Sequence, residues 1–263
     1  MSSSPRPSEQ LTAAAHRNHE AMFPNYKSVL KETDPELIAI FDNWAFDDVL
    51  ELSQIDEQTR IMVIVASTIG SGALSEYKIM IGAALNAGVT PVAIKEILYQ
   101  ATAYVGMAKA FDFLHATNEI FANRKIQLPI EGQSTTTRET RFDKGLATQK
   151  EIFGSSAIDQ MYVNSPRDLM HIQRFLSGHC FGDFYTRKGL DLKHRELVTL
   201  AILIAMGGTE GQIKGHVRGN LNVGNDRGVL LNVITQLLPW VGYPRTLNAI
   251  TCVNELAPSI DPG

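Results

Sequence analysis

The fold is decided by one apolar stretch, Leu197-Val-Thr-Leu-Ala-Ile-Leu-Ile-Ala-Met206, and by a shorter version of it, Ile61-Met-Val-Ile-Val-Ala66. Both are apolar on every helical face, which is typical of a segment that is buried on all sides. Buried strands would show the same pattern. However, the charged Arg60 and Arg195-Glu196 lead directly into them without a turn residue in between. We therefore predict two central helices and, since no convincing pair of alternating strands occurs along the chain, an all-α fold.

A tandem duplication organises the chain. When the sequence is shifted against itself by 136 positions, Asn86-Ala-Gly88 falls on Asn222-Val-Gly224, and Val105-Gly106 falls on Val241-Gly242. Upstream the register is 135 positions, which aligns the starts of the two apolar stretches. Two copies are too few for a solenoid, which needs about three units. We therefore predict two homologous helical domains related by a pseudo-twofold axis.

The boundaries follow from composition. Residues 127–141 lie between the copies, are polar and lack periodicity, as expected for a linker. The predicted organisation is a disordered leader at 1–20, a first domain at 21–126, a linker at 127–145 and a second domain at 146–263.

Composition also excludes several classes of protein. The 263 residues carry 24 Lys+Arg against 28 Asp+Glu, a formal net charge of -4, so no basic field is available for nucleic acid. The longest apolar stretch is about half of the roughly 20 residues that a membrane-spanning helix needs, so no membrane partner is expected. The two cysteines, Cys180 and Cys252, form neither a disulfide framework nor a CxxC pair, and a cytoplasmic location is expected.

Three motifs of the second copy follow one another with a characteristic spacing. They are Phe181-Gly-Asp-Phe-Tyr-Thr-Arg-Lys-Gly-Leu-Asp191, Gly208-Thr-Glu-Gly-Gln-Ile-Lys-Gly-His216 and Pro239-Trp-Val-Gly-Tyr-Pro-Arg245. Together they resemble the carboxymuconolactone decarboxylase family of the alkyl hydroperoxidase D-like superfamily, and the first copy resembles the same domain more faintly. The resemblance implies a double-domain, all-helical member that forms a homo-oligomer, a trimer or a hexamer-like ring.

Two chemistries occur among proteins of this type. The hydroperoxidase branch uses a CxxC pair before a histidine, because peroxide reduction needs a thiolate and a resolving thiol. At the corresponding positions, seven and four residues before His216, this chain has Thr209 and Gln212. A peroxiredoxin-type antioxidant function is therefore disfavoured and is kept only as an alternative.

The resemblance to the decarboxylase branch implies an enzyme without a metal or an organic cofactor. Its substrate would be a small carboxylated lactone or carbonyl acid, and its chemistry would need a proton donor or base near the carbon that loses CO₂. We expect His216 to fill this role, with Glu210 and Gln212 as further catalytic residues. Gln212 and Thr209 share a helix face with His216. The alternative is a solvent-facing His216 on a non-catalytic oligomeric scaffold.

Carboxylate binding requires cations, and Arg187 and Lys214 are the predicted clamps, since the arginine fork binds a carboxylate bidentately. Other roles stay open. Arg187 could pair with Asp183 or Asp191, and Lys214, which recurs as Lys78, could be structural. The other predicted substrate-binding residues are Tyr185, Trp240 and Glu76; Tyr104 is a further candidate for the pocket wall.

The copies differ at the predicted site. Met80 stands at the first-copy position of His216, and Glu76 at that of Gln212. One hypothesis is a composite site of Glu76 and His216. The interpretation we favour is a first copy that has lost its site and serves as a scaffold.

Glu196 directly precedes the longer apolar stretch. In the hydroperoxidase branch a glutamate near this position relays protons to the thiols, which are missing here. We therefore expect Glu196 either to pair with Arg195 or Arg60 or simply to be buried with another partner. The remaining histidines show no spacing that matches a zinc site, and no metal is predicted.

Overall fold

A computed structural model describes residues 10–24, 26 and 28–259. Within these residues the chain consists of helices and their connections, without a strand, which confirms the all-α prediction. No helix of this part of the chain is both long and apolar enough to cross a membrane. In chain order the helices are α1 (Ala13–Met22), α2 (Leu30–Thr33), α3 (Pro35–Asn43), η2 (Trp44–Asp48), α4 (Val49–Glu51), α5 (Glu57–Ser71), α6 (Leu74–Asn86), α7 (Pro91–Val105), α8 (Met107–Asn123), α9 (Arg141–Phe153), α10 (Ser155–Val163), η3 (Arg167–Leu169), α11 (Met170–Phe175), η4 (Leu176–Tyr185), α12 (Leu192–Met206), α13 (Glu210–Asn222), α14 (Arg227–Val241) and α15 (Tyr243–Leu256).

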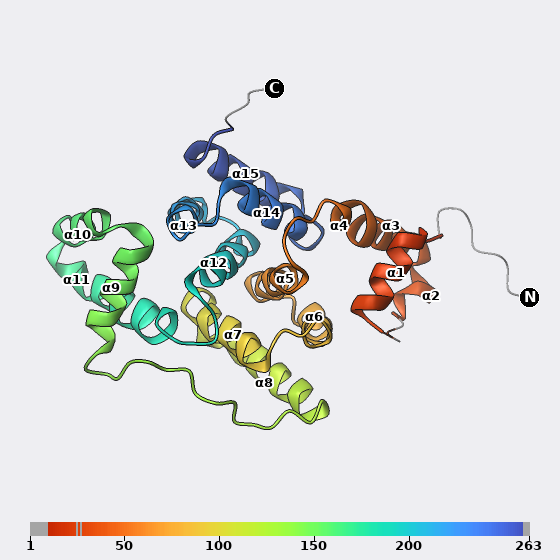
Figure 1. Cartoon of the computed structure of the whole chain (residues 1–263), viewed down its shortest axis with the longest axis horizontal. Helices are drawn as coiled ribbons and strands as arrows, with labels where there is room; N and C mark the ends of the chain where they lie inside the picture. The colour runs from red at the N-terminus through yellow and green to blue at the C-terminus, as the bar shows by residue number, and fades with distance from the viewer. Residues whose placement is uncertain (1–9, 25, 27, 260–263) are drawn as a thin grey trace, which may run out of the picture.

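The two apolar stretches form α5 and α12, which pack against each other at the centre of the molecule (Figure 1). Each helix begins after an aspartate, Asp56 or Asp191, whose side chain accepts a hydrogen bond from the backbone three residues on. The helices approach closely at Gly70, where a Cβ atom would lie 2.5 Å from the carbonyl oxygen of Ile202. The core therefore lies between the two copies, as a pseudo-twofold pair requires.

Around this central pair, each copy repeats the same series of helices. In the first copy α6, α7 and α8 follow α5, and in the second copy α13, α14 and α15 follow α12 (Figure 1). A short π-helix also precedes each central helix, η2 in the first copy and η4 in the second. The tandem repeat seen in the sequence is thus a repeat of structure.

The structural duplication extends further upstream than the residues that align between the two copies in the sequence. Helix α1 packs on η2, and α9 packs on η4 in the same way. In both places two phenylalanine rings meet edge to face, Phe23 with Phe46 at 5.9 Å and Phe153 with Phe181 at 5.7 Å between centroids. Each repeat therefore contains an additional helix that helps to enclose a cavity.

The first of these helices corrects the predicted leader at 1–20. Residues 13–20 are helical, because Thr12 caps α1 and the fully buried Ala15 anchors it to the core. Residues 1–9 lie outside the described part of the chain. The polar sequence suggested disorder, but tertiary packing stabilises this helix.

The second helix falls partly inside the predicted linker at 127–145. Helix α9 begins at Arg141, whose guanidinium lies 2.7 Å from the carboxylate of Asp183. Four residues later Gly145 lies directly against the backbone of η4, where no side chain would fit. Contacts with η4, far along the chain, therefore order the end of a segment that has little periodicity of its own.

Candidate active site

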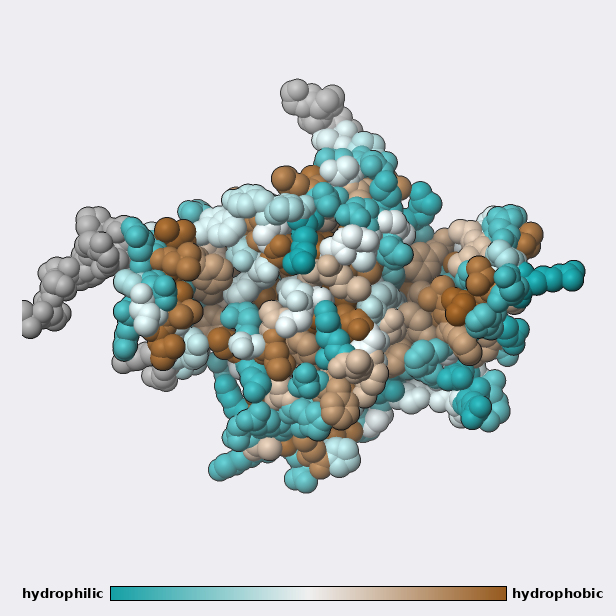
Figure 2. All heavy atoms as spheres, turned by 180° about the vertical axis from the view of Figure 1, so that it is seen from behind, coloured by the Kyte–Doolittle hydropathy of each residue, from teal (hydrophilic) through white to brown (hydrophobic). Residues whose placement is uncertain are grey.

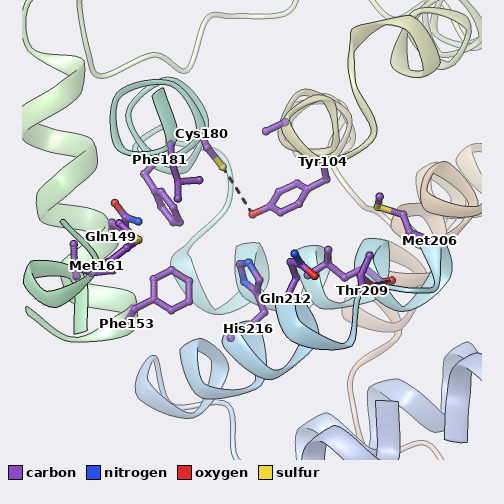
Figure 3. A pocket seen from close by; sticks show the side chains of 15 residues that line it. Tyr104, Gln149, Phe153, Met161, Cys180, Phe181, Met206, Thr209, Gln212 and His216 are labelled. Carbon is purple, nitrogen blue, oxygen red and sulfur yellow. Dashed lines mark hydrogen bonds between the residues drawn. The ribbon is translucent and has the colours of Figure 1, made fainter. Parts of the chain in front are cut away.

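His216 lies on α13 with its ring facing a cavity of about 510 Å³ (Figure 3). Only 9% of the residue is exposed, so the ring is not a solvent-facing surface group. Its Nδ1 atom lies 2.9 Å from Oε2 of Glu196. Because this hydrogen bond uses Nδ1, the Nε2 atom is left to face a ligand.

Glu196, on α12, is completely buried. The backbone beside it is adapted to the carboxylate, because a Cβ atom on Gly219 would lie only 2.5 Å from Glu196 Oε2. The Asn220 side chain donates hydrogen bonds to the carbonyl oxygens of Glu196 and His216, at 3.2 and 2.8 Å. These contacts hold the two helices in register, so that the carboxylate orients the imidazole ring.

Of the two expectations for Glu196, pairing with Arg195 or Arg60 is therefore wrong, and burial with another partner is confirmed, since the buried carboxylate pairs with His216. Arg195 lies 3.0 Å from Glu96 of α7, and Arg60 lies 3.9 Å from Glu57 on its own helix. The reason is helix geometry: consecutive residues on a helix point about 100° apart, so Arg195 faces α7 while Glu196 faces α13.

The cavity is enclosed by both copies (Figure 3). Tyr104 of the first copy and Phe153 of α9 surround the His216 ring, with centroids 5.9 and 5.4 Å away and rings edge to face. The predicted neighbours Thr209 and Gln212 also line the cavity. The complete lining consists of Ala103, Tyr104, Gln149, Phe153, Ile158, Met161, Leu176, Cys180, Phe181, Leu203, Met206, Thr209, Gln212, Gly215 and His216.

The hydroxyl of Tyr104 belongs to a buried chain of hydrogen bonds. It lies 2.8 Å from the hydroxyl of Tyr185, which lies 2.7 Å from that of Thr199. Burial raises the pKa of both tyrosines well above 10, so both hydroxyls keep their protons at neutral pH. Tyr104 can thus donate a hydrogen bond into the cavity, while Tyr185 supports it from behind and does not itself line the cavity.

A single thiol faces His216. Cys180 Sγ lies 4.0 Å from the Tyr104 hydroxyl, and burial raises the pKa of this thiol to about 12. Cys252 lies on α15 and does not line this cavity; its thiol contacts the carbonyl oxygen of Glu210. The site therefore has neither a thiolate nor a second thiol within its lining, as the missing CxxC pair predicts.

The two predicted carboxylate clamps lie outside the cavity lining. Arg187 binds Glu96 of the first copy, with Nε 3.0 Å from both carboxylate oxygens, and does not pair with Asp183 or Asp191. Lys214 pairs with Glu255 at 2.5 Å on the surface. The equivalent Lys78 and Glu119 repeat this ion pair in the first copy at 3.5 Å, which supports the structural interpretation of Lys214. Among the described residues, no lysine or arginine lines the cavity.

The remaining predicted site residues also lie elsewhere. Glu210 accepts a hydrogen bond of 2.9 Å from the side chain of Asn248, which lies on α15. Trp240 packs edge to face on Phe41 and lines a different cavity together with Glu76. The hypothetical composite of Glu76 and His216, which the sequence analysis did not favour, is not formed, since the two residues face separate cavities.

Two residues beside the His216 ring were not assigned to the site from the sequence. Glu196 carried a signal, because a single acid in an apolar helix must find a partner when it is buried. Phe153 carried none, since it belongs to the helix outside the matched repeat. Metal binding is not indicated, because no group of three His, Cys, Asp or Glu residues within the described ranges could hold an ion.

Comparison with known proteins identifies the family of the chain. The model of the carboxymuconolactone decarboxylase family matches residues 35–119 and again residues 171–255, together more than half of the chain. The 4-carboxymuconolactone decarboxylase of Acinetobacter baylyi is 28% identical over 118 residues, which cover 45% of this chain and 87% of that protein. The nitrosuccinic acid decarboxylase of Metarhizium robertsii is 25% identical over 109 residues, which cover 41% of this chain and 76% of that protein.

Proposed function

The chain belongs to the carboxymuconolactone decarboxylase family, and from this premise we propose that it is a carboxy-lyase in which His216 moves the proton. The substrate class is a small carbonyl acid or carboxylated lactone. The observation that carries the proposal is the hydrogen bond of 2.9 Å between His216 and the buried Glu196, beside a cavity of about 510 Å³. A buried carboxylate that orients an imidazole is a common arrangement for acid–base catalysis.

The substrate needs to receive only one proton. When the bond between the substrate and its carboxylate breaks, CO₂ leaves and the electron pair of that bond moves onto the neighbouring carbonyl group as an enolate. The proton on Nε2 of the His216 imidazolium is then transferred to the carbon that lost CO₂. A proton from solvent restores the ring, so that one carboxylate and one proton become CO₂ and a new C–H bond.

Two further features of the cavity suit this decarboxylation. The Tyr104 hydroxyl, which burial keeps protonated by raising its pKa, can donate a hydrogen bond to the enolate oxygen. The mostly apolar wall excludes water from the leaving carboxylate, whose charge must disperse as CO₂ forms. Because no described lysine or arginine lines the cavity, a substrate with a single carboxylate fits better than a polycarboxylate.

The test is a panel of small keto acids and carboxylated lactones, with CO₂ release measured for the full chain and for His216→Ala. We expect release from at least one acid, and a loss of about 10²- to 10⁴-fold in the variant, because the proton donor is removed. Glu196→Gln should also lower the rate while the fold is kept. The exposed histidine of α8 provides the control, and His115→Ala should leave the rate unchanged.

Either of two results would contradict the proposal. One is CO₂ release by His216→Ala at the rate of the unmodified chain. The other is no release from any acid of the panel by protein with an unchanged far-ultraviolet circular dichroism spectrum, which would favour a scaffold function.

We also propose that the chain forms a homo-oligomer through its two ends. Apolar side chains are exposed at equivalent positions of the two repeats, Leu37 and Ile40 on α3 and Ile172 and Phe175 on α11. Apolar side chains gather at both ends of the face shown in Figure 2. Exposed apolar patches of this kind mark interaction sites. Light scattering after gel filtration should give a mass of several chains, and Ile40→Asp with Phe175→Asp should reduce it.

A further inference from the structure

A second cavity, of about 140 Å³, lies in the first copy at the place equivalent to the candidate active site. The correspondence is residue by residue: Trp240 replaces Tyr104, and Glu76 replaces Gln212. The cavity is enclosed by α1, α3, η2 and α6 of the first copy and by α14 of the second. Each repeat therefore retains a cavity closed by a ring from the opposite copy.

The second cavity differs in its charge. Asp42 is only 4% exposed, and its Oδ2 atom has no hydrogen bond, although the Lys31 ammonium lies 3.4 Å away. Glu76 has neither a hydrogen bond nor an ion pair with any described residue, and burial raises the pKa of this carboxyl. Burial also lowers the pKa of His19, so this ring is neutral at pH 7. Two carboxylates and one ammonium leave about one unit of uncompensated negative charge.

Aromatic rings form much of the remaining wall. Phe41 contacts Trp240 on one side at 5.5 Å and Phe46 on the other at 5.9 Å, in both cases edge to face. Phe23 continues the series against Phe46. Ring faces carry negative partial charge and attract cations, most strongly those with a bulky, weakly hydrated ammonium group.

From this combination we propose that the first copy binds a small organic ammonium ion, with Glu76 as the principal counter-ion. A carboxylate without a partner in a half-buried site is costly, and a cation beside it would offset that cost. The volume corresponds to about four or five water molecules, which limits the ligand to a few heavy atoms. A metal ion is not expected, since no three His, Cys, Asp or Glu side chains of the described residues converge on such a site.

This site is independent of the proposed decarboxylation. The hydrogen-bonded pair of Glu196 and His216, here called the dyad, is absent from the first copy. Met80 occupies the position of His216 and Ile61 that of Glu196, and both are fully buried. The cavity thus lacks the dyad of the second copy, and binding is the function that its charge and rings support.

Tetramethylammonium chloride is the probe, titrated into the ¹⁵N-labelled full chain at constant ionic strength while the indole N–H signals are followed. The chain has two tryptophans, and Trp44 is an internal reference, because it stacks on Tyr243 and does not line this cavity. We expect the Trp240 signal to shift and saturate while the Trp44 signal stays in place. The neutral tert-butanol, which has a similar size, should not shift the Trp240 signal.

Glu76→Gln is the decisive variant, and its affinity for tetramethylammonium should be weaker by about tenfold, which is about 1.4 kcal/mol. Glu76 has no partner to lose, so this variant is expected to fold. Glu119→Gln is the matched control, because Glu119 pairs with Lys78 on the surface, and its affinity should be unchanged. The proposal is overturned if tetramethylammonium leaves the Trp240 signal in place, if tert-butanol shifts it equally, or if Glu76→Gln binds as tightly as the unmodified chain.

Discussion

The cavities of the two copies occupy equivalent places in a duplicated fold. They differ in the pair of residues that stands at two equivalent positions. In the second copy Glu196 and His216 form a hydrogen-bonded pair beside a large cavity. In the first copy the same two positions hold Ile61 and Met80, which are fully buried in the hydrophobic core. The fold is therefore compatible with either pair, and in the proposed reaction only the pair of the second copy can move a proton.

The neighbouring backbone has changed together with the pair. Gly219 leaves room for the Glu196 carboxylate, and the equivalent residue of the first copy is Ala83, which is buried. A methyl group is tolerated there because no carboxylate oxygen lies beside it. The comparison indicates that the dyad and its glycine form one unit.

The strongest test of this comparison converts the second copy to the residues of the first. In the double variant Glu196→Ile with His216→Met, CO₂ release should disappear. The melting temperature should stay equal or rise, because replacing a buried polar pair by apolar side chains of similar volume is often neutral or stabilising. Thermal unfolding and the CO₂ assay measure the two effects separately.

The single variants sharpen the same test. Glu196→Ile alone leaves the Nδ1 of a buried imidazole without a partner and should cost about 1 to 3 kcal/mol of unfolding free energy. The two substitutions should therefore be strongly non-additive. If the two single variants lose equal amounts of unfolding free energy and these losses add up in the double variant, the pair is not a structural unit.

A smaller effect is expected from the glycine. Gly219→Ala adds a Cβ atom 2.5 Å from Glu196 Oε2 and 2.9 Å from the Phe153 ring, and should destabilise the protein by about 1 to 3 kcal/mol while lowering CO₂ release. Gly211→Ala is the control on the same helix, because nothing lies within 4 Å of its added Cβ. It should be neutral or stabilising by up to about 1 kcal/mol. Similar urea midpoints for both variants would refute the close contact at Gly219.

The smallest effect concerns the predicted clamp. Lys214→Ala removes an exposed ion pair with Glu255 and should leave CO₂ release unchanged, with a stability change within about 0.5 kcal/mol. The repeat supplies the matched variant, since Lys78→Ala removes the equivalent pair with Glu119. A large rise in KM for Lys214→Ala, without one for Lys78→Ala, would show that Lys214 binds the substrate and that the two ion pairs are not equivalent.

Local patterns predicted much of this molecule. The apolar stretches and the repeated N-x-G sequences identified α5, α12 and the duplication. The spacing of Thr209, Gln212 and His216 placed all three on one side of the segment that forms α13 and its N-cap, where they line the cavity. These predictions succeed because helix period and capping depend on residues only a few positions apart.

The wrong predictions all concern contacts across the chain. Arg187 resembled a substrate clamp, but it is bound by Glu96, 91 positions away. For Glu196 the sequence left the partner open between an arginine and another buried group, and the rotation between consecutive helical residues directs this side chain to His216. Charges of suitable sign are numerous along the chain, and the sequence does not show which of them meet.

The sequence alone determined an all-helical, duplicated chain, its family and the imidazole at its candidate site, because these depend on local periodicity and on motifs with short spacing. Only the tertiary structure decided that Glu196 orients His216, that Tyr104 of the other copy covers the ring, and that the predicted cations are paired elsewhere. Such pairings join distant segments, and they are selected by the packing of α5 against α12, which brings the two copies together.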